Sequence, residues 1–214
     1  MAALSLADLQ PMLLTERRNA FSDPGWSFEL KFDGYRLLAE IAAGKVALKS
    51  RGGANATRWF PEVAAGLAAL PGGRHVLDGE VCVLDAMGRS DFDRLHARAK
   101  RRRWYEGADP VVFCAFDALV VNGRDIMAKP LAARKTALRR LLTPALAQVL
   151  YVAGIGGEGV ALYEQAVALK LEGIVAKRDS SPYVPGARSP DWVKIKRPGA
   201  TPAGRFGRYP GNPE

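Results

Sequence analysis

The sequence has few of the residues that build disulfide bonds or zinc sites. It contains two cysteines, Cys82 and Cys114, and two histidines, His75 and His96. Each cysteine lies in an apolar stretch typical of a strand. We therefore interpret both as small buried hydrophobic residues rather than as a disulfide or a metal pair. The two histidines are far apart in the sequence, which argues against a zinc site.

Long hydrophobic runs are also missing. The apolar run Val111–Val121 is interrupted by Asp117, whereas a membrane-spanning helix needs roughly twenty apolar residues. Residues 1–10 lack the basic start of a signal peptide, so we expect a cytoplasmic protein with no membrane partner. No Gly-X-Y or heptad repeat is present, which excludes collagen-like and coiled-coil architectures. No segment reads Gly-x-x-x-x-Gly-Lys-Ser/Thr, which excludes a P-loop NTPase.

The chain does have the composition of a folded protein, with an excess of positive charge. Of its 214 residues, 48% are hydrophobic and 25% are charged, which excludes wholesale disorder. Lysine and arginine total 31 against 22 acidic residues, giving a formal net charge of +9. This excess suggests a polyanionic partner, and the alternative is a basic surface that serves solubility. Residues 94–103 concentrate it, with six cations and no acidic residue.

The order of the expected strands and helices favours an α+β fold. Alternating apolar residues predict strands, and apolar residues three or four apart predict helices. The expected strands are 26–31, 36–41, 46–50, 75–85, 110–121, 148–153, 173–177 and 192–196. The expected helices are a short piece near 6–14 and longer segments at 57–70, 90–103, 130–142 and 157–171. This irregular order argues for antiparallel sheets flanked by helices rather than for a doubly wound parallel fold.

Domain organisation follows from a change of composition near the end. Residues 1–197 are expected to form one domain. Residues 198–214 contain four prolines and four glycines, and we expect a flexible tail there.

Lys31 has the clearest chemical meaning. It ends an apolar strand and is followed by Phe32-Asp33-Gly34-Tyr35-Arg36, so that Arg36 can return to the same cleft on the next strand. A lysine is nucleophilic only when neutral, and a nearby cation together with partial burial favours that form. The alternative is a surface lysine beside a hairpin turn, because so short a match is weak alone.

Five further segments follow Lys31 in order, and together they resemble the motifs of covalent nucleotidyltransferases. This superfamily comprises ATP-dependent DNA ligases, RNA ligases and capping enzymes. Six motifs in the right order over residues 29–197 are highly specific. The resemblance is closest to the ligase domain of bacterial end-joining DNA ligases, and segments 11–13, 23–26 and 181–183 support that narrower assignment. The six segments are Lys31–Arg36, Ser50–Gly53, Leu77–Val81, Phe113–Leu119, Leu171–Lys177 and Asp191–Lys196.

The resemblance implies a reaction and a nucleotide cleft between the sheets. Lys31 would attack the α-phosphate of ATP, hold AMP as a phosphoramidate and pass it to a DNA 5′-phosphate for nick sealing in DNA repair and recombination. The implied contacts are Glu29 near adenine, Phe116 stacked on adenine, Glu80 at a ribose hydroxyl, Arg36 and Arg51 on ribose and phosphate, Glu172 near the metal or ribose, and Lys194 and Lys196 on the α-phosphate. Mg²⁺ or Mn²⁺ is implied because phosphoryl transfer needs neutralisation of developing charge.

Each of these roles has a structural alternative. Phe116 on a buried strand can be a core aromatic. Glu172 can be an exposed carboxylate at a helix end. Lys194 and Lys196 alternate along a strand, and they can be solvated lysines that protect a sheet edge.

DNA binding is expected at the basic segment. Successive helical residues point about 100° apart, so roughly three or four of its cations can reach phosphates together. We expect nicked duplex DNA to be contacted by Arg98, Lys100, Arg101 and Arg102. The alternative is a solvated helix face.

The sequence departs from the ligase pattern after Lys196. Ligases of this kind carry an OB-fold domain there, and the residues that follow Arg197 are too few for an OB barrel. A separate chain could supply that domain, the chain could be a minimal adenylation unit, or it could have been shortened. Two other functions stay open: an RNA ligase or capping-type nucleotidyltransferase, and a non-catalytic nucleic-acid-binding module.

Overall fold

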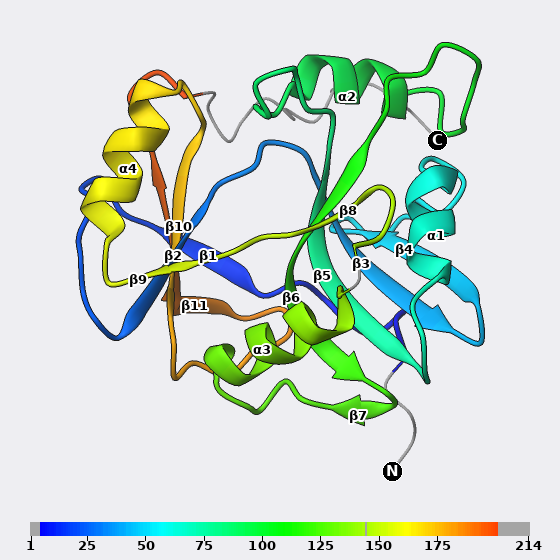
Figure 1. Ribbon diagram of the computed structural model, residues 1–214, viewed down its shortest axis with the longest axis horizontal. Helices are drawn as coiled ribbons and strands as arrows, with labels where there is room; N and C mark the ends of the chain where they lie inside the picture. The colour runs from blue at the N-terminus through cyan, green and yellow to red at the C-terminus, as the bar shows by residue number, and fades with distance from the viewer. Residues whose placement is uncertain (1–4, 144, 201–214) are drawn as a thin grey trace, which may run out of the picture.

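Two β-sheets face each other and are flanked by helices (Figure 1). This computed structural model describes residues 5–143 and 145–200, so most of the predicted tail, residues 201–214, lies outside the described residues. The helices are α1 (Pro61–Ala68), α2 (Phe92–Ala99), α3 (Leu131–Leu141) and α4 (Gly159–Ala168). None of these helices combines the length and apolarity needed to cross a bilayer.

The first sheet has five strands in the order β1-β11-β10-β2-β9. Neighbouring strands are antiparallel except β1 and β11, which are parallel. Its strands are β1 (Leu13–Glu16), β2 (Trp26–Leu30), β9 (Ile155–Gly156), β10 (Gly173–Arg178) and β11 (Arg188–Lys196).

The second sheet has the order β4-β3-β5-β6-β7, with β8 paired to β6. Its pairs are antiparallel except β6 with β8. Its strands are β3 (Tyr35–Ala42), β4 (Lys45–Ser50), β5 (His75–Cys82), β6 (Val112–Val121), β7 (Arg124–Asp125) and β8 (Val149–Tyr151). The predicted α+β fold with antiparallel sheets and flanking helices is confirmed.

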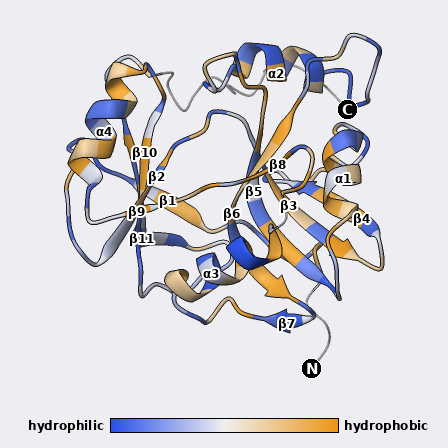
Figure 2. Ribbon diagram, in the orientation of Figure 1, coloured by the Kyte–Doolittle hydropathy of each residue, from blue (hydrophilic) through white to orange (hydrophobic). Residues whose placement is uncertain are grey.

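Buried apolar side chains join the elements, and Figure 2 shows apolar residues concentrated on the central strands. One cluster packs the second sheet against α1, and another packs the first sheet against α4. A third cluster lies between the sheets and includes Met12, Leu38, Val120 and Trp192. Burial of these side chains on both sheets is the hydrophobic contribution that holds the sheets face to face.

The helix expected near residues 6–14 is wrong. This segment forms a turn followed by the edge strand β1. Leu6, Leu9 and Met12 are buried, so their spacing reflects an irregular segment that covers the core. The ammonium group of Lys49 anchors the turn by donating to three backbone carbonyl oxygens in it.

The helix expected over residues 90–103 ends early. Asp91 caps α2 by accepting a hydrogen bond from the backbone N–H of Arg94 at 3.0 Å, in agreement with the predicted start. The helix ends at Ala99, and Arg102 has φ +51°, a left-handed conformation that does not continue a helix. The last cations of the basic segment therefore lie in a loop.

Helix α4 packs one side against the first sheet. Ala166 is buried against the first sheet, and Tyr163 packs against the same cluster. Val160 and Val167 are 40% and 39% exposed. They are seven residues apart and therefore share one helix side, which points away from the sheet.

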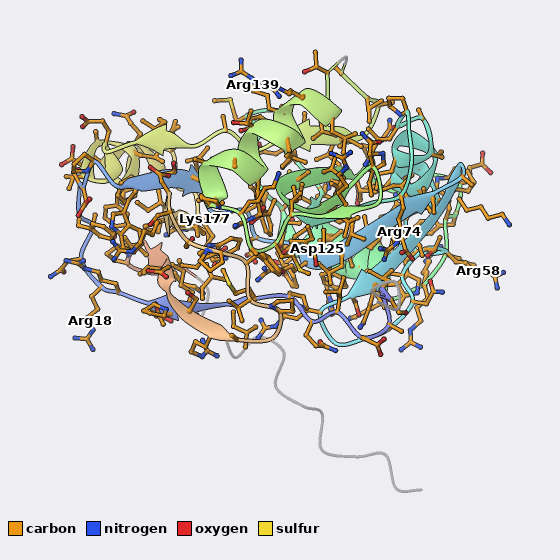
Figure 3. All side chains as sticks on the ribbon, turned by 90° about the horizontal axis from the view of Figure 1, so that it is seen from below. Arg18, Arg58, Arg74, Asp125, Arg139 and Lys177 are labelled. Atoms are coloured by element: carbon orange, nitrogen blue, oxygen red, sulfur yellow. The ribbon has the colours of Figure 1, made fainter. Side chains whose placement is uncertain are left out.

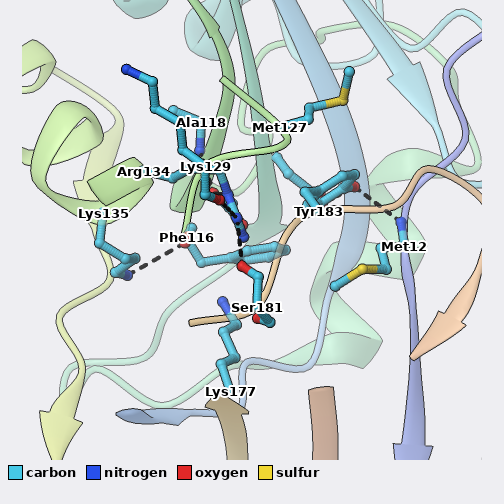
Figure 4. Close-up of polar contacts among 12 residues, drawn as sticks. Met12, Phe116, Ala118, Met127, Lys129, Arg134, Lys135, Lys177, Ser181 and Tyr183 are labelled. Carbon is cyan, nitrogen blue, oxygen red and sulfur yellow. Dashed lines mark hydrogen bonds and ion pairs between the residues drawn. The ribbon is translucent and has the colours of Figure 1, made fainter. Parts of the chain in front are cut away.

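A fully buried ion pair docks α3 on β6. Nη2 of Arg134 lies 2.9 Å from Oδ2 of Asp117, and both side chains are 0% exposed. Nη1 of Arg134 donates to the carbonyl oxygens of Lys129 at 2.6 Å and Ser181 at 2.8 Å (Figure 4). This arrangement fixes the start of α3 and hence the position of the next residue, Lys135.

Removal of the Arg134 charge should destabilise the fold strongly. Arg134→Met leaves Asp117 buried and unpaired, which should lower the free energy of unfolding by about 3–5 kcal/mol. Adding Asp117→Asn should recover part of this loss, because no uncompensated charge then remains. Urea unfolding monitored by circular dichroism measures both effects. The control, Arg139→Met, changes a residue near the other end of α3 and should stay within about 0.5 kcal/mol of wild type. Equal stability of Arg134→Met and the control would contradict this role.

Candidate active site

The motif segments meet around Lys31, which directly follows β2. Its Nζ lies 2.6 Å from Oε2 of Glu172, the residue before β10. The other carboxylate oxygen of Glu172 lies 3.2 Å from Nζ of Lys196 at the end of β11. Segments more than 140 residues apart thus form one Lys31–Glu172–Lys196 cluster. The carboxylate fixes the position of the Lys31 amine, which must lose a proton before it can act as a nucleophile.

Gly34, three residues after Lys31, allows its backbone to lie close to the backbone of β5. A Cβ atom at Gly34 would lie 2.2 Å from the carbonyl oxygen of Val81 and 2.8 Å from Sγ of Cys82. Only glycine fits there without a shift of β5, because real Cβ atoms do not come that close. The Lys-x-Asp-Gly spacing therefore brings Lys31 next to β5, the strand that carries Glu80.

A slot opens beside Lys31 between the two sheets. Phe116 forms part of its second-sheet wall, where Nζ of Lys177 lies 4.4 Å from the centre of its ring and the Arg36 guanidinium lies 5.3 Å away. Trp192 packs edge-on against Phe116 at 6.3 Å between ring centres. The side chains lining the slot include Glu29, Lys31, Arg36, Glu80, Phe116, Val152, Lys177 and Trp192.

Arg36 lines the slot but is tied to a buried carboxylate. Its Nε and Nη2 donate to Asp78 at 3.0 and 2.6 Å. The hydroxyl of Tyr183 donates to Asp78 at 2.7 Å and accepts from the backbone N–H of Met12 at 3.0 Å. Segments 11–13 and 181–183 supported the resemblance to bacterial end-joining ligases, and both are thus linked to Asp78 through Tyr183. Asp78 lies within one of the six motifs but had no predicted role, and nothing in the sequence indicated its bond to Tyr183.

Glu29 also lines the slot, yet both of its carboxylate oxygens are occupied. Oε1 lies 2.6 Å from Nζ of Lys135, and Oε2 lies 2.6 Å from Nζ of Lys177. Burial disfavours the charged carboxylate, but the two lysines outweigh it and hold the pKa of Glu29 below its usual value. Lys177 ends one of the six motifs but had no predicted role. Lys135 had no signal beyond its place in a basic helix.

Glu80 is partly buried in the slot wall. Burial raises its pKa to about 7, Glu172 and Asp78 add to the rise, and Lys31 and Arg36 oppose it. Glu80 therefore changes charge near neutral pH, on the wall of the slot. A carboxyl group in this position can accept a hydrogen bond from a sugar hydroxyl when it is ionised.

Three predicted phosphate contacts are not among the residues that line the slot: Arg51, Lys194 and Lys196. Lys194 pairs with Glu16 of β1 at 2.9 Å, whereas Lys196, on the same strand, reaches Glu172. Hydrogen bonding and the charge of Lys194 lower the pKa of Glu16. Arg51 is exposed and is not among the residues that line the slot.

Arg98 does not belong to a DNA-binding surface. Its side chain is 1% exposed, lies 2.5 Å from Oε1 of Glu62, and donates to the backbone carbonyl of Asp109. A buried, paired guanidinium cannot reach a phosphate, so the prediction for this residue is wrong. The other three predicted contacts, Lys100, Arg101 and Arg102, are exposed at the end of α2.

The residues fit a magnesium site only in part. No group of three or more metal-ligating side chains forms among residues 5–143 and 145–200. Glu172 and Glu80 are close enough to raise the pKa of Glu80. One or two carboxylates that share an ion with substrate phosphates is the arrangement that Mg²⁺ prefers. The slot therefore fits a metal that arrives with a phosphate ligand.

Glu80 should make stability depend on pH. Its folded-state pKa of about 7 lies above the ordinary value of 4.5, so the folded protein keeps a proton that the unfolded chain has lost. Stability therefore falls as pH rises from about 5 to 7 and stays lower above pH 7. Glu80→Gln removes this loss and should be more stable than wild type by about 1–3 kcal/mol at pH 8, with little difference at pH 4. Urea unfolding at both pH values tests this. The exposed Glu164→Gln is the control, and a pH-independent difference for Glu80→Gln would contradict the assignment.

Two relatives of known description share most of this chain. It is 36% identical over 187 residues to the SPbeta prophage-derived DNA ligase-like protein LigB of Bacillus subtilis, covering 87% of this chain and 67% of the relative. It is 35% identical over 193 residues to the multifunctional non-homologous end joining protein LigD of Mycolicibacterium smegmatis. That match covers 88% of this chain and 24% of LigD, so the chain spans about a quarter of that relative.

Two solved structures with the same arrangement carry the name of DNA ligase D. The mycobacterial DNA ligase D complexed with ATP and MES has a TM-score of 0.78 and 34% identity, over 90% of this chain and 62% of that one. The ligase domain of M. tuberculosis LigD has a TM-score of 0.77 and 32% identity, with the same coverage. The family profile described as ATP dependent DNA ligase domain matches residues 9–196, which include all six motifs. With Lys31, Glu172 and Lys196 assembled in one cluster, this chain belongs to the ATP dependent DNA ligase domain family.

Proposed function

We propose that this chain is the adenylation unit of an ATP-dependent DNA ligase that acts in bacterial DNA repair. The observation that carries the proposal is the Lys31–Glu172–Lys196 cluster, of which Lys31 also lines the slot. Lys31 forms a bond to the α-phosphorus of ATP, and the bond to the β-phosphate breaks, releasing pyrophosphate. The AMP then moves from Lys31 to a DNA 5′-phosphate, which restores the free lysine.

The residues of the slot divide the work of this reaction. Glu172 lies closest to the Lys31 ammonium and can take its proton, and Lys196 lies on the same carboxylate, ready to contact the α-phosphate. Phe116 offers an aromatic face to the adenine. Mg²⁺ or Mn²⁺, when bound, would neutralise charge on the phosphates. Glu172 and Glu80 are the residues that would hold it.

Nick sealing is proposed for this chain together with a further domain. The chain matches 62% of the LigD ligase-domain chains, and an OB-fold domain is the part that the sequence resemblance leaves out. That domain would belong to a longer chain or to a separate partner. DNA is proposed to lie across the exposed cations Lys100, Arg101 and Arg102. The rings of Tyr105 and Trp59 lie 3.9 and 5.9 Å from the guanidinium groups of Arg101 and Arg102.

Loss of the nucleophile should abolish adenylation. Neither Lys31→Ala nor Lys31→Arg should form protein–AMP with α-labelled ATP and Mg²⁺, because arginine keeps the charge but is never neutral near pH 7. Acid-labile label on the protein is measured after gel separation. The exposed Lys45→Ala is the control and should label like wild type. Label in either Lys31 variant would place the nucleophile elsewhere. Label from GTP instead of ATP would indicate capping chemistry, and no label on wild type would favour a binding module.

The basic loop, residues 100–102, should account for part of the salt dependence of DNA binding. The triple variant Lys100→Gln, Arg101→Gln, Arg102→Gln should bind nicked duplex more weakly than wild type. The slope of log affinity against log salt should fall by about 0.9 for each phosphate that the variant no longer neutralises. Fluorescence anisotropy over a salt series measures the slope.

A matched triple variant tests whether the effect is local. Lys45→Gln, Lys129→Gln, Arg139→Gln removes the same charge from other exposed sites and should change the slope less. Adenylation of Lys31 should survive in both variants. Equal slopes in the two triple variants would identify the basic loop as a solvated surface.

A further inference from the structure

Lys135 lies beneath the slot, outside every motif of the sequence. It projects from α3 and is 8% exposed. Its Nζ lies 2.6 Å from Oε1 of Glu29 and 3.4 Å from the carbonyl oxygen of Phe116, and it also donates to the carbonyl oxygen of Val152. Figure 4 shows the contact with Phe116, and it also labels Lys177, the other lysine that pairs with Glu29.

The three acceptors belong to the two opposite sheets. Glu29 lies on β2 of the first sheet, and Phe116 lies on β6 of the second. Val152 directly follows β8, and its N–H donates to the carbonyl of Ala115 on β6 at 2.9 Å. An ammonium group has three N–H donors, and here each has an acceptor on a residue that lines the slot.

This contact differs from the apolar packing between the sheets. Apolar side chains fill much of the interface, and such packing has no preferred direction. Hydrogen bonds lose strength steeply with distance and angle. A single ion that bonds both walls therefore sets their separation more narrowly than apolar packing does.

We propose that Lys135 is a positioning residue for nucleotide binding, which fixes the width of the slot by joining Glu29 on one wall to the Phe116 and Val152 carbonyls on the other. The inference rests on the proposed function, because the readout is the reaction with ATP. Lys135 does not touch the reacting atoms. It acts on affinity by keeping both walls at the spacing that a nucleotide base and sugar fill.

Lys135 can be replaced by a neutral residue without leaving an isolated buried charge. Glu29 also pairs with Lys177 at 2.6 Å, so removing Lys135 leaves a neutral Glu29–Lys177 pair rather than an isolated buried charge. Burial lowers the pKa of Lys177, whereas the charge of Glu29 opposes this change. The like charge of Lys135 also lowers the pKa of Lys177, so Lys135→Met favours the charged Lys177 that Glu29 needs.

The test is the dependence of Lys31 adenylation on ATP concentration in single-turnover experiments. Lys135→Met should raise the ATP concentration for half-maximal rate about tenfold, and the rate at saturating ATP should stay within about threefold of wild type. Lys135→Arg keeps the charge but replaces the ammonium with a planar guanidinium group. The ATP concentration for its half-maximal rate should lie between the values of wild type and Lys135→Met. The control is Arg139→Met, which removes a cation from the same helix and should match wild type; Figure 3 shows Arg139 pointing away from the protein.

A second measurement separates slot width from general destabilisation. In a Lys31→Ala background, calorimetric ATP affinity should fall by the same factor on adding Lys135→Met, with no chemistry involved. A purely structural role predicts instead a lower melting temperature and a smaller active fraction at unchanged half-saturation, and that result overturns the inference. If Lys135→Met fails to fold, a wild-type half-saturation value in folded Lys135→Arg overturns it equally. Absence of adenylation in wild type would contradict the proposed function itself.

Discussion

The nucleotide slot depends on one buried carboxylate, Glu29, held between Lys135 and Lys177. Each lysine approaches a different oxygen at 2.6 Å, and the three side chains come from α3, β2 and β10. A charged group at the meeting of two sheets is costly to bury unless it is paired and hydrogen-bonded. Once paired, it resists collapse of the walls onto each other. The space beside Lys31 can therefore stay open although buried apolar side chains pack much of the interface.

Two further buried polar networks hold the walls of the slot in place around the Glu29 contact. Arg134 and Asp117 fix α3 on β6, and the next residue of the helix is Lys135. On the opposite side, Asp78 receives Arg36 and Tyr183, and Tyr183 in turn accepts from the N-terminal segment at Met12. The residues that face the nucleotide are thus held by neighbours that do not touch it. Preorganisation of this kind lowers the cost of ordering a site when the ligand binds.

The sequence could predict the motifs and the fold class, because both depend on local pattern. Lys31, Glu172 and Lys196 lie in short segments whose order is diagnostic, and the structure brings them together. It could not predict Lys135 or the bond from Tyr183 to Asp78, since each pairs residues more than 100 positions apart with no local signal. The prediction that Arg98 contacts DNA was wrong for a related reason. A run of cations shows charge but not burial, and its partner Glu62 lies on another helix.

The prediction of a helix near residues 6–14 was wrong because apolar spacing alone does not distinguish a helix from an irregular segment packed on a core.

The central claim is that a nucleotide enters the slot between the sheets and becomes bonded to Lys31. A crystal structure of the wild-type protein after incubation with ATP and Mg²⁺ tests it most directly. The account predicts AMP bonded to Nζ of Lys31, with its base against Phe116 and Glu172 moved off the lysine. Nucleotide with its base among Asp85, Arg89 and Asp93, in the cavity on the other side of Lys31 and Glu172, with Lys31 unmodified and still paired to Glu172, would contradict it.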